Sequence, residues 1–130
     1  MTEETRPLVL VADDDAAVRG FFCEVLKNVC GLRTSEAASV AETLAKTVSE
    51  KPDAVFIDRN FPDGSAQDYC AGLEKAGEEA RAVPKFVITG EKLFSWDETF
   101  WKRYGVIGYL VKPCRIEQLQ KAVDLCLKKK

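Results

Sequence analysis

Five short apolar segments, each followed by a helical pattern, constrain the fold of this chain more than any other feature. Four are rich in β-branched residues, and the fifth, at 32–37, is weaker. The four clear segments are 8–11, 54–57, 85–88 and 109–111. Segments that are apolar on both faces are typical of strands in a parallel sheet that helices cover on both sides. Strand and helix therefore alternate five times, which predicts an α/β fold.

Apolar periodicity and capping patterns mark the helices between these strands. The first helix carries apolar residues at offsets of three and four, and we expect this face to lie in the core. These residues are Val18, Phe21, Phe22, Val25, Leu26 and Val29. Capping-box patterns at 39–42 and 95–98 predict two helix starts. A helix is expected over 66–76, the stretch 77–84 reads as a loop, and the last helix begins near Ile116.

The topology of such a chain follows from the handedness of its crossovers. Right-handed connections produce a doubly wound sheet, and five strands in 130 residues suit the flavodoxin-like strand order 2-1-3-4-5. The length fits one domain of ordinary size, a sandwich of three layers over residues 1–130. In this order the ligand crevice lies at the carboxyl ends of the first and third strands.

Composition excludes several classes of function. The formal net charge of -2 gives no basic field, so direct binding to nucleic acid or to an anionic membrane is not expected. Five cysteines without CxxC spacing argue against a disulfide framework and a zinc knuckle. The chain has no histidine, which leaves Asp, Glu, Lys and Thr for any chemistry. No stretch resembles a signal peptide or a membrane span of about twenty apolar residues, so we expect a cytoplasmic protein.

Acidic residues follow the two strands that border the predicted crevice. The first strand ends at Asp13, Asp14 and Asp15, and the third ends at Asp58. Because these strands are neighbours, the carboxylates of Asp13, Asp14 and Asp58 should lie close together. Each close pair repels by about 4 kcal/mol at about 4 Å and an effective dielectric constant of about 20. A cation relieves this repulsion, and ligands that are all oxygen favour Mg²⁺ or Mn²⁺ over zinc.

Each strand-end residue also has an ordinary structural explanation. Asp15 stands where a helix N-cap is expected, and Asp58 precedes a turn at 62–64. Thr89 alone could end a strand, and Lys112 alone could be a solvated lysine. Together these residues place carboxylates, a hydroxyl and an ammonium at four strand ends on one side of a sheet. That combination favours a common site.

Four stretches of the chain resemble the receiver domains of response regulators in two-component signal transduction. They are 8–15 followed by Arg19, 58–64, 89–90 and 108–113. The resemblance spans essentially the whole chain and implies a CheY-like receiver domain over 1–130, with no output domain. It also implies a phosphoprotein that takes its phosphoryl group from a histidine kinase or a histidine phosphotransfer protein. Such a domain catalyses only its own phosphorylation and dephosphorylation.

The resemblance assigns the acidic residues to phosphoryl transfer. Asp58 would be the phosphoacceptor, and Asp13, Asp14, Asp58 and the backbone carbonyl of Asn60 would bind Mg²⁺ or Mn²⁺. These roles agree with the reading from the residues, because phosphoryl transfer needs a nucleophile in line and positive charge near the equatorial oxygens. A carboxylate is a competent nucleophile that forms a mixed anhydride.

The resemblance also assigns the residues at the ends of the last two strands. Thr89 and Lys112 would bind phosphoryl oxygens, and the bond between Lys112 and Pro113 would be cis. In similar receivers the threonine moves toward the phosphoryl group and an aromatic residue on the last strand turns inward. Tyr109 holds that position here, so Thr89 and Tyr109 form the expected switch.

Two polar residues are expected to tune the lifetime of the phosphorylated state. Asn60 and Glu91 lie two residues beyond Asp58 and Thr89, where receivers use side chains to control hydrolysis. The same pair occurs in single-domain chemotaxis regulators. We expect these polar groups to orient water and to give a phospho-aspartate that lasts seconds to minutes.

An aromatic cluster after Thr89 departs from the usual receiver pattern. Its members are Phe94, Trp96, Phe100, Trp101 and Tyr104. A short helix cannot bury all of these on one face, so some should lie on the surface. We expect the helix after Ser95, the strand at 109–111 and the last helix to form a docking face. A downstream target protein or a second copy of the chain would bind there.

Two other classes of protein remain open from the residues alone. The Asp-x-Asp within 13–15 also occurs in Mg²⁺-dependent phosphatases of the haloacid-dehalogenase type, whose nucleophile would be Asp13. That family normally has Thr or Val where this chain has Ala17, and it usually needs a longer chain with a cap. The second class is a receiver fold that serves as a passive scaffold, although every residue type of the acceptor site is present.

Overall fold

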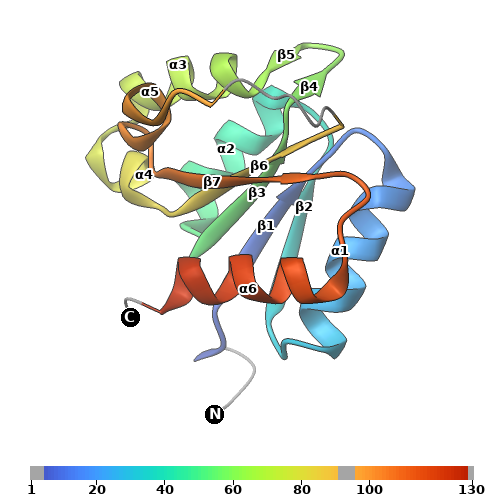
Figure 1. The fold of residues 1–130 in the computed structure, drawn as a ribbon. Helices are drawn as coiled ribbons and strands as arrows, with labels where there is room; N and C mark the ends of the chain where they lie inside the picture. Colours follow the sequence, from blue (N-terminus) through green and yellow to red (C-terminus); the bar gives the residue numbers. More distant parts are fainter. Residues whose placement is uncertain (1–4, 91–95, 129–130) are drawn as a thin grey trace.

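A parallel sheet of five strands forms the centre of the computed structural model, which describes residues 5–90 and 96–128 (Figure 1). The strands are β1 Leu8–Ala12, β2 Arg33–Ala37, β3 Ala54–Asp58, β6 Lys85–Thr89 and β7 Val106–Val111. Their order is β2-β1-β3-β6-β7. A hairpin of two residues a side, β4 Asn60–Phe61 and β5 Gly64–Ser65, follows β3. When the five strands of the main sheet are numbered without the hairpin strands, their order is 2-1-3-4-5. The predicted flavodoxin-like α/β topology is therefore confirmed.

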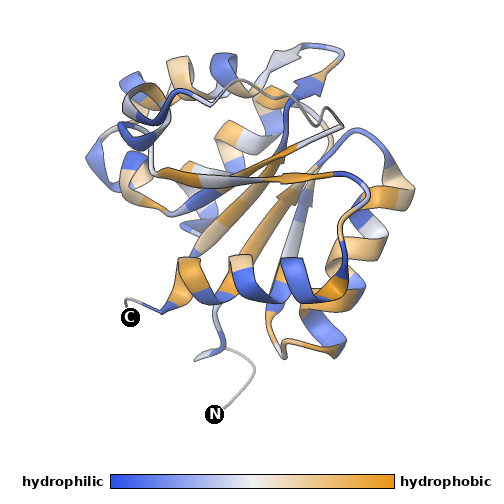
Figure 2. Ribbon diagram, in the orientation of Figure 1, coloured by the Kyte–Doolittle hydropathy of each residue, from blue (hydrophilic) through white to orange (hydrophobic). Residues whose placement is uncertain are grey.

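Helices cover both faces of the sheet and complete the three layers (Figure 1). On one face lie α1 Ala16–Asn28 and α6 Ile116–Leu127. On the other face lie α2 Val40–Glu50, α3 Ala66–Ala76, α4 Glu78–Ala82 and α5 Glu98–Lys102. The central strands β1, β3 and β6 are largely orange in Figure 2, whereas the helices alternate orange and blue around their axes, as the amphipathic patterns predict.

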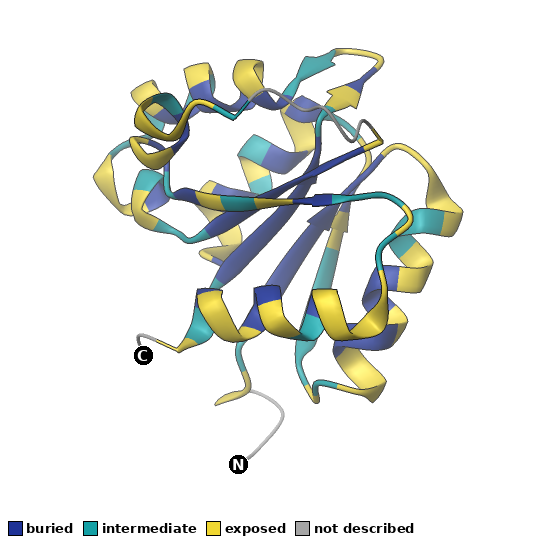
Figure 3. Cartoon of the chain, in the orientation of Figure 1, coloured by how far each residue is buried: buried dark blue, intermediate teal, exposed yellow. Residues whose placement is uncertain are grey.

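The core consists of two apolar clusters, one on each face of the sheet. Alternate strand residues supply them: Leu10 and Val55 face α2 and α3, whereas Val11 and Phe56 face α1 and α6. Every residue of β3 and β6 is buried, and these strands are dark blue in Figure 3. The β-branched apolar runs are therefore explained by burial on both faces.

The first helix buries a narrower face than its sequence predicts. Phe21 and Val29, which were expected in the core, are 42 % and 50 % exposed. Phe22, Val25 and Leu26 are buried as expected. The apolar pattern is wider than the stripe that the sheet covers. Phe21 instead lines a surface pocket beside the turn after β7.

Two predicted helix boundaries differ from the structure. The stretch 77–84 was expected to be a loop, but it contains the short helix α4. The helix predicted to start at Ser95 begins at Glu98, because Asp97 is the N-cap and accepts a hydrogen bond from the Phe100 N–H at 3.2 Å. Ser95 itself, like Phe94, lies outside the described residues. Helix α2 does start as predicted, with the Ser39 side chain accepting from the Glu42 N–H at 3.0 Å.

Within the described ranges, no helix combines the length and the apolar character needed to cross a membrane. All five cysteines are free thiols, as their spacing suggested.

Candidate metal centre at the carboxyl edge of the sheet

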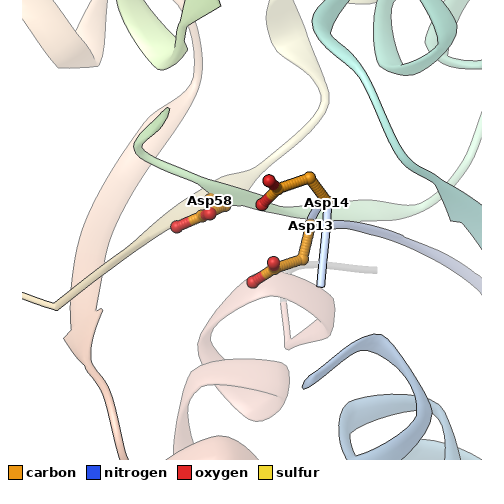
Figure 4. A group of neighbouring side chains, drawn as sticks. All are labelled: Asp13, Asp14 and Asp58. Atoms are coloured by element: carbon orange, nitrogen blue, oxygen red, sulfur yellow. The ribbon is translucent and has the colours of Figure 1, made fainter. Parts of the chain in front are cut away.

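Three carboxylates meet where β1 and β3 end. Asp13 and Asp14 follow β1, Asp58 ends β3, and the two strands pair directly with Ala12 opposite Ile57. One oxygen from each carboxylate lies within 4.8 Å of the others, and Figure 4 shows the three groups gathered in one place. Asp13 is completely buried, Asp58 is 8 % exposed and Asp14 is exposed. The sheet order thus brings together the acidic residues that the sequence predicted to converge.

Lys112 contributes a positive charge to the same place. Its Nζ lies 3.2 Å from Asp13 Oδ2 and 3.2 Å from Asp58 Oδ1. The residue follows β7, its N–H donates to the carbonyl of Thr89 at 2.7 Å, and its bond to Pro113 is cis. Burial opposes the charged form, but the Asp58 and Asp13 carboxylates raise the pKa of Lys112 above its ordinary value. The side chain is therefore an ammonium at neutral pH.

The surroundings of Asp58 disfavour its ionised form. Burial and the neighbouring charge of Asp13 raise the pKa of Asp58 above its ordinary value. Hydrogen bonds from Lys112 and from the Arg59 N–H, at 2.9 Å, act in the opposite direction but do not reverse the shift. Further positive charge near Asp58 would favour its ionised form.

The donors of this cluster fit a hard divalent cation. Three carboxylates face one ammonium, which leaves two negative charges to be balanced. Opposing ligands of Mg²⁺ lie about 4.2 Å apart when each Mg–O distance is about 2.1 Å. Only one pair among three ligands can be opposite, and adjacent ligands of the octahedron lie about 3.0 Å apart. Oxygens within 4.8 Å of one another are near enough to converge on one ion. All the candidate ligands are oxygens, which favours Mg²⁺ or Mn²⁺.

Asp15 supports the site without belonging to it. Its side chain caps α1 by accepting from the N–H groups of Ala17 at 2.9 Å and Val18 at 3.4 Å. Its own N–H donates to Asp13 Oδ1 at 2.9 Å. The N-cap explanation is therefore correct for Asp15, and the same residue helps to orient the Asp13 carboxylate.

The segment after Asp58 is anchored by a contact that the sequence did not reveal. Asn60 pairs with Ser65 in the small hairpin, and its side chain is exposed. At the tip, the Asp63 carboxylate accepts from the N–H groups of Val40 at 2.9 Å and Ala41 at 3.2 Å. These backbone hydrogen bonds lower the pKa of Asp63. The proline–aspartate–glycine sequence indicated a turn, but nothing local indicated that its aspartate contacts the start of α2.

Thr89 and Tyr109 lie on the same face of the sheet. Thr89 is buried at the end of β6, and the preceding residue, Ile88, pairs with Asp58. Tyr109 pairs with Val87 and is 37 % exposed. Because side chains alternate along a strand, Val87, Thr89 and Tyr109 face the α5 side together. Glu91, the second tuning residue expected from the sequence, lies outside the described residues.

Trp96 lies against Tyr109 and links it to Trp101. The Trp96 ring lies 5.6 Å from the Tyr109 ring and stacks on Trp101 at 6.0 Å. Trp101 and Tyr104 are buried, whereas Trp96 and Phe100 are partly exposed. The expectation that the aromatics divide between core and surface is confirmed for these four residues.

Comparison with known proteins agrees with this geometry. The model of the response regulator receiver domain family matches residues 9–124. The KDP operon transcriptional regulatory protein KdpE of Escherichia coli is 29 % identical over 93 % of this chain and 51 % of its own length. The sensory transduction protein LytR of Staphylococcus haemolyticus is 30 % identical over 88 % of this chain and 43 % of its own length. This chain therefore spans about half the length of the curated relatives that it matches.

A solved structure of similar size shows the same fold. The chemotaxis response regulator CheY4 of Vibrio cholerae superposes with a TM-score of 0.80 and 25 % sequence identity. The superposition covers 95 % of this chain and 100 % of that one. The family match, these relatives and the shared fold all agree with the acidic crevice described above. The chain belongs to the response regulator receiver domain family of two-component systems.

Proposed function

We propose that this receiver domain accepts a phosphoryl group on Asp58 in a reaction that requires Mg²⁺, or Mn²⁺ in its place. The donor would be a histidine kinase or a histidine phosphotransfer protein. One observation carries the proposal: the Asp13, Asp14 and Asp58 carboxylates lie within 4.8 Å of one another, with Lys112 bridging two of them. Asp13, Asp14, Asp58 and the Asn60 carbonyl would hold the ion.

The transfer itself needs little from the protein except position and charge. An Asp58 oxygen forms a bond to phosphorus as the bond from phosphorus to the donor's imidazole nitrogen breaks. An ion held by Asp13, Asp14 and Asp58 would supply positive charge near the transferring oxygens. Lys112, already in an ion pair with Asp58 Oδ1, would bind a phosphoryl oxygen, and the Thr89 hydroxyl would bind another. The Arg59 N–H holds the Asp58 carboxylate in a fixed orientation.

The domain would catalyse only its own phosphorylation and dephosphorylation, so it is not an enzyme with a separate substrate. Asn60 and Glu91 would orient the water that hydrolyses the phospho-aspartate, giving a lifetime of seconds to minutes. The exposed position of the Asn60 side chain is compatible with access to water. A cytoplasmic location follows from the same proposal, because the donors belong to intracellular signalling.

The signal would leave the domain through α5, β7 and α6. Thr89 moving toward the phosphoryl group would allow Tyr109 to turn inward from its half-exposed position. Apolar side chains exposed on β7 and α6 support a binding face there: Ile107, Tyr109, Ile116 and Leu125. The partner would be a downstream protein or a second copy of this chain, with no direct contact to nucleic acid or membrane. Residues 1–130 would act as one receiver unit.

The two competing explanations have no support. A phosphatase of the haloacid-dehalogenase type would use Asp13 as its nucleophile, yet Asp13 is completely buried and the receiver family model covers 9–124. A passive scaffold does not need a lysine held between two carboxylates or an acidic cluster with the spacing of a cation site.

Titration with Mg²⁺ and beryllofluoride, monitored by tryptophan fluorescence, tests the proposal. Beryllofluoride mimics a phosphoryl group on a carboxylate, so wild type should show a saturable, Mg²⁺-dependent change. Asp58→Asn should show none. The matched control is Asp124→Asn, an exposed aspartate on α6, which should behave as wild type. A full beryllofluoride response in Asp58→Asn would show that Asp58 is not the acceptor.

A further inference from the structure

Arg19 reaches from α1 to the peptide bond that joins two of the proposed metal ligands. Its Nη1 donates to the backbone carbonyl of Asp13 at 2.7 Å. That carbonyl belongs to the peptide unit between Asp13 and Asp14. The arginine side chain is only 18 % exposed, so the contact is shielded from water on most sides.

The same guanidinium is held in place by a second contact. Arg19 Nε donates to Glu36 Oε1 at 3.0 Å, and Glu36 belongs to β2, the neighbour of β1. The Asp13 N–H donates to the carbonyl of Ala37, the next residue of β2, at 3.0 Å. Both polar backbone groups of Asp13 are therefore fixed relative to β2, one directly and one through Arg19.

We propose that Arg19 is a positioning residue for the metal centre, fixing the Asp13–Asp14 peptide so that both carboxylates aim at one ion. The inference rests on the proposed function, because it concerns the same site. Two adjacent side chains point to one place only when the backbone between them has a single orientation. Asp13 has its carboxylate fixed by Lys112 and the Asp15 N–H. Asp14 is exposed and depends on its backbone for direction.

Charge explains why an arginine paired with a glutamate suits this position. An unpaired guanidinium near the acidic cluster would repel a divalent cation. The Glu36 carboxylate, 3.0 Å from Arg19 Nε, offsets that charge. The planar guanidinium can serve two acceptors at fixed angles, which a lysine ammonium on a flexible stem does less well. Arg19 can therefore orient the acidic pair with little repulsion of the ion.

A purely structural role for Arg19 makes a different prediction, and the chain offers a matched control. Arg33 Nε donates to the backbone carbonyl of Arg6 at 2.9 Å. Arg33 begins β2, so this contact lies at the end of the sheet opposite the acidic cluster. If arginine-to-carbonyl contacts only stabilise the fold, Arg19→Ala and Arg33→Ala should have similar effects.

The experiment measures Mg²⁺ affinity by calorimetry for wild type, Arg19→Ala, Arg19→Lys and Arg33→Ala. Partners that orient metal ligands typically contribute about 10-fold to 100-fold in affinity, so Arg19→Ala should weaken Mg²⁺ binding by that range. Arg19→Lys should recover part of the loss, and Arg33→Ala should bind Mg²⁺ as wild type does. Urea unfolding in EDTA confirms that each variant is folded.

A second readout does not involve the metal. Amide hydrogen exchange at Asp13, whose N–H donates to the carbonyl of Ala37, should be faster in EDTA for Arg19→Ala than for wild type and unchanged for Arg33→Ala. Wild-type Mg²⁺ affinity in Arg19→Ala, or equal losses in Arg19→Ala and Arg33→Ala, would overturn the positioning role. Absence of Mg²⁺ binding in wild type would instead contradict the proposed function itself, so the two failures are distinguishable.

Discussion

At the scale of single residues, the site is defined by two buried carboxylates that share one ammonium. Asp13 and Asp58 each lie 3.2 Å from Lys112 Nζ, and Asp14 adds a third carboxylate without adding a cation. The three carboxylates repel one another, and a bound divalent ion would reduce this repulsion. The repulsion is visible in Asp58, whose pKa is raised by burial and by Asp13.

The raised pKa predicts an unusual pH dependence for the metal-free protein. The unfolded chain releases the Asp58 proton as pH rises above 3.8. The folded protein still holds this proton, because its pKa is higher. The contribution of this group to the unfolding free energy is therefore present at low pH and falls as pH rises from 3.8 through the raised pKa. Asp58→Asn should therefore gain stability relative to wild type as pH rises through this window.

Urea unfolding in EDTA at several pH values measures this difference. Mg²⁺ should reduce the difference in unfolding free energy between wild type and Asp58→Asn, because the ion competes with the proton for Asp58. A difference between wild type and Asp58→Asn that does not change with pH would contradict the electrostatic description of the site.

At the scale of elements, the ends of two short helices meet a buried lysine. Lys85, the first residue of β6, is completely buried, and its Nζ lies 2.7 to 3.1 Å from four backbone carbonyl oxygens, which share its three N–H donors. These oxygens belong to Ala80, Arg81, Val83 and Tyr104. One side chain thus satisfies carbonyls at the ends of α4 and α5.

Replacing this lysine should destabilise both helix ends. Lys85→Met leaves buried carbonyls without a donor, and we expect a loss of at least about 2 kcal/mol at pH 7. Burial lowers the pKa of Lys85 to about 7, so between pH 7 and 10.5 the unfolded chain binds a proton that the folded protein has released. The unfolding free energy of wild type should therefore rise with pH across that window relative to Lys85→Met. Denaturant unfolding at pH 7 and pH 9 checks both points, and a pH-independent difference would contradict the pKa shift.

The contact between α5 and β7 provides a reporter of the proposed switch. Trp96 lies against Tyr109, whereas Trp101 is buried and stacks on Trp96. If Tyr109 turns inward, the surroundings of Trp96 change more than those of Trp101. Trp101→Phe, which keeps Trp96, should retain most of the fluorescence change that beryllofluoride causes, and Trp96→Phe should lose most of it. Equal responses in the two variants would argue against movement of Tyr109.

At the scale of the whole molecule, the sequence predicted features that depend on repeated patterns. The apolar runs at 54–57 and 85–88 indicated strands buried on both faces, and the β-α alternation then determined the sheet order. That order alone predicts that Asp13, Asp14 and Asp58 lie together, because the carboxyl ends of parallel strands share one edge. The convergence is a property of the fold.

Features that depend on tertiary contacts were missed. The exposure of Phe21 follows from which stripe of α1 the sheet covers, and a helical pattern does not contain that information. Arg19 and Asp63 form hydrogen bonds with backbone groups. Every residue has these groups, so the sequence does not indicate which of them a side chain will contact. The start of α5 at Glu98 reflects the choice of Asp97 over a nearby serine as N-cap, since both residue types cap helices well.

Identification of the residue that becomes phosphorylated tests the central claim most directly. The protein is incubated with acetyl phosphate and Mg²⁺, reduced with borohydride to trap the acyl phosphate, and mapped by mass spectrometry. We predict modification at Asp58 alone, abolished by EDTA and absent from Asp58→Asn. Modification at Asp13, or labelling of Asp58 that does not require a divalent ion, would contradict the account.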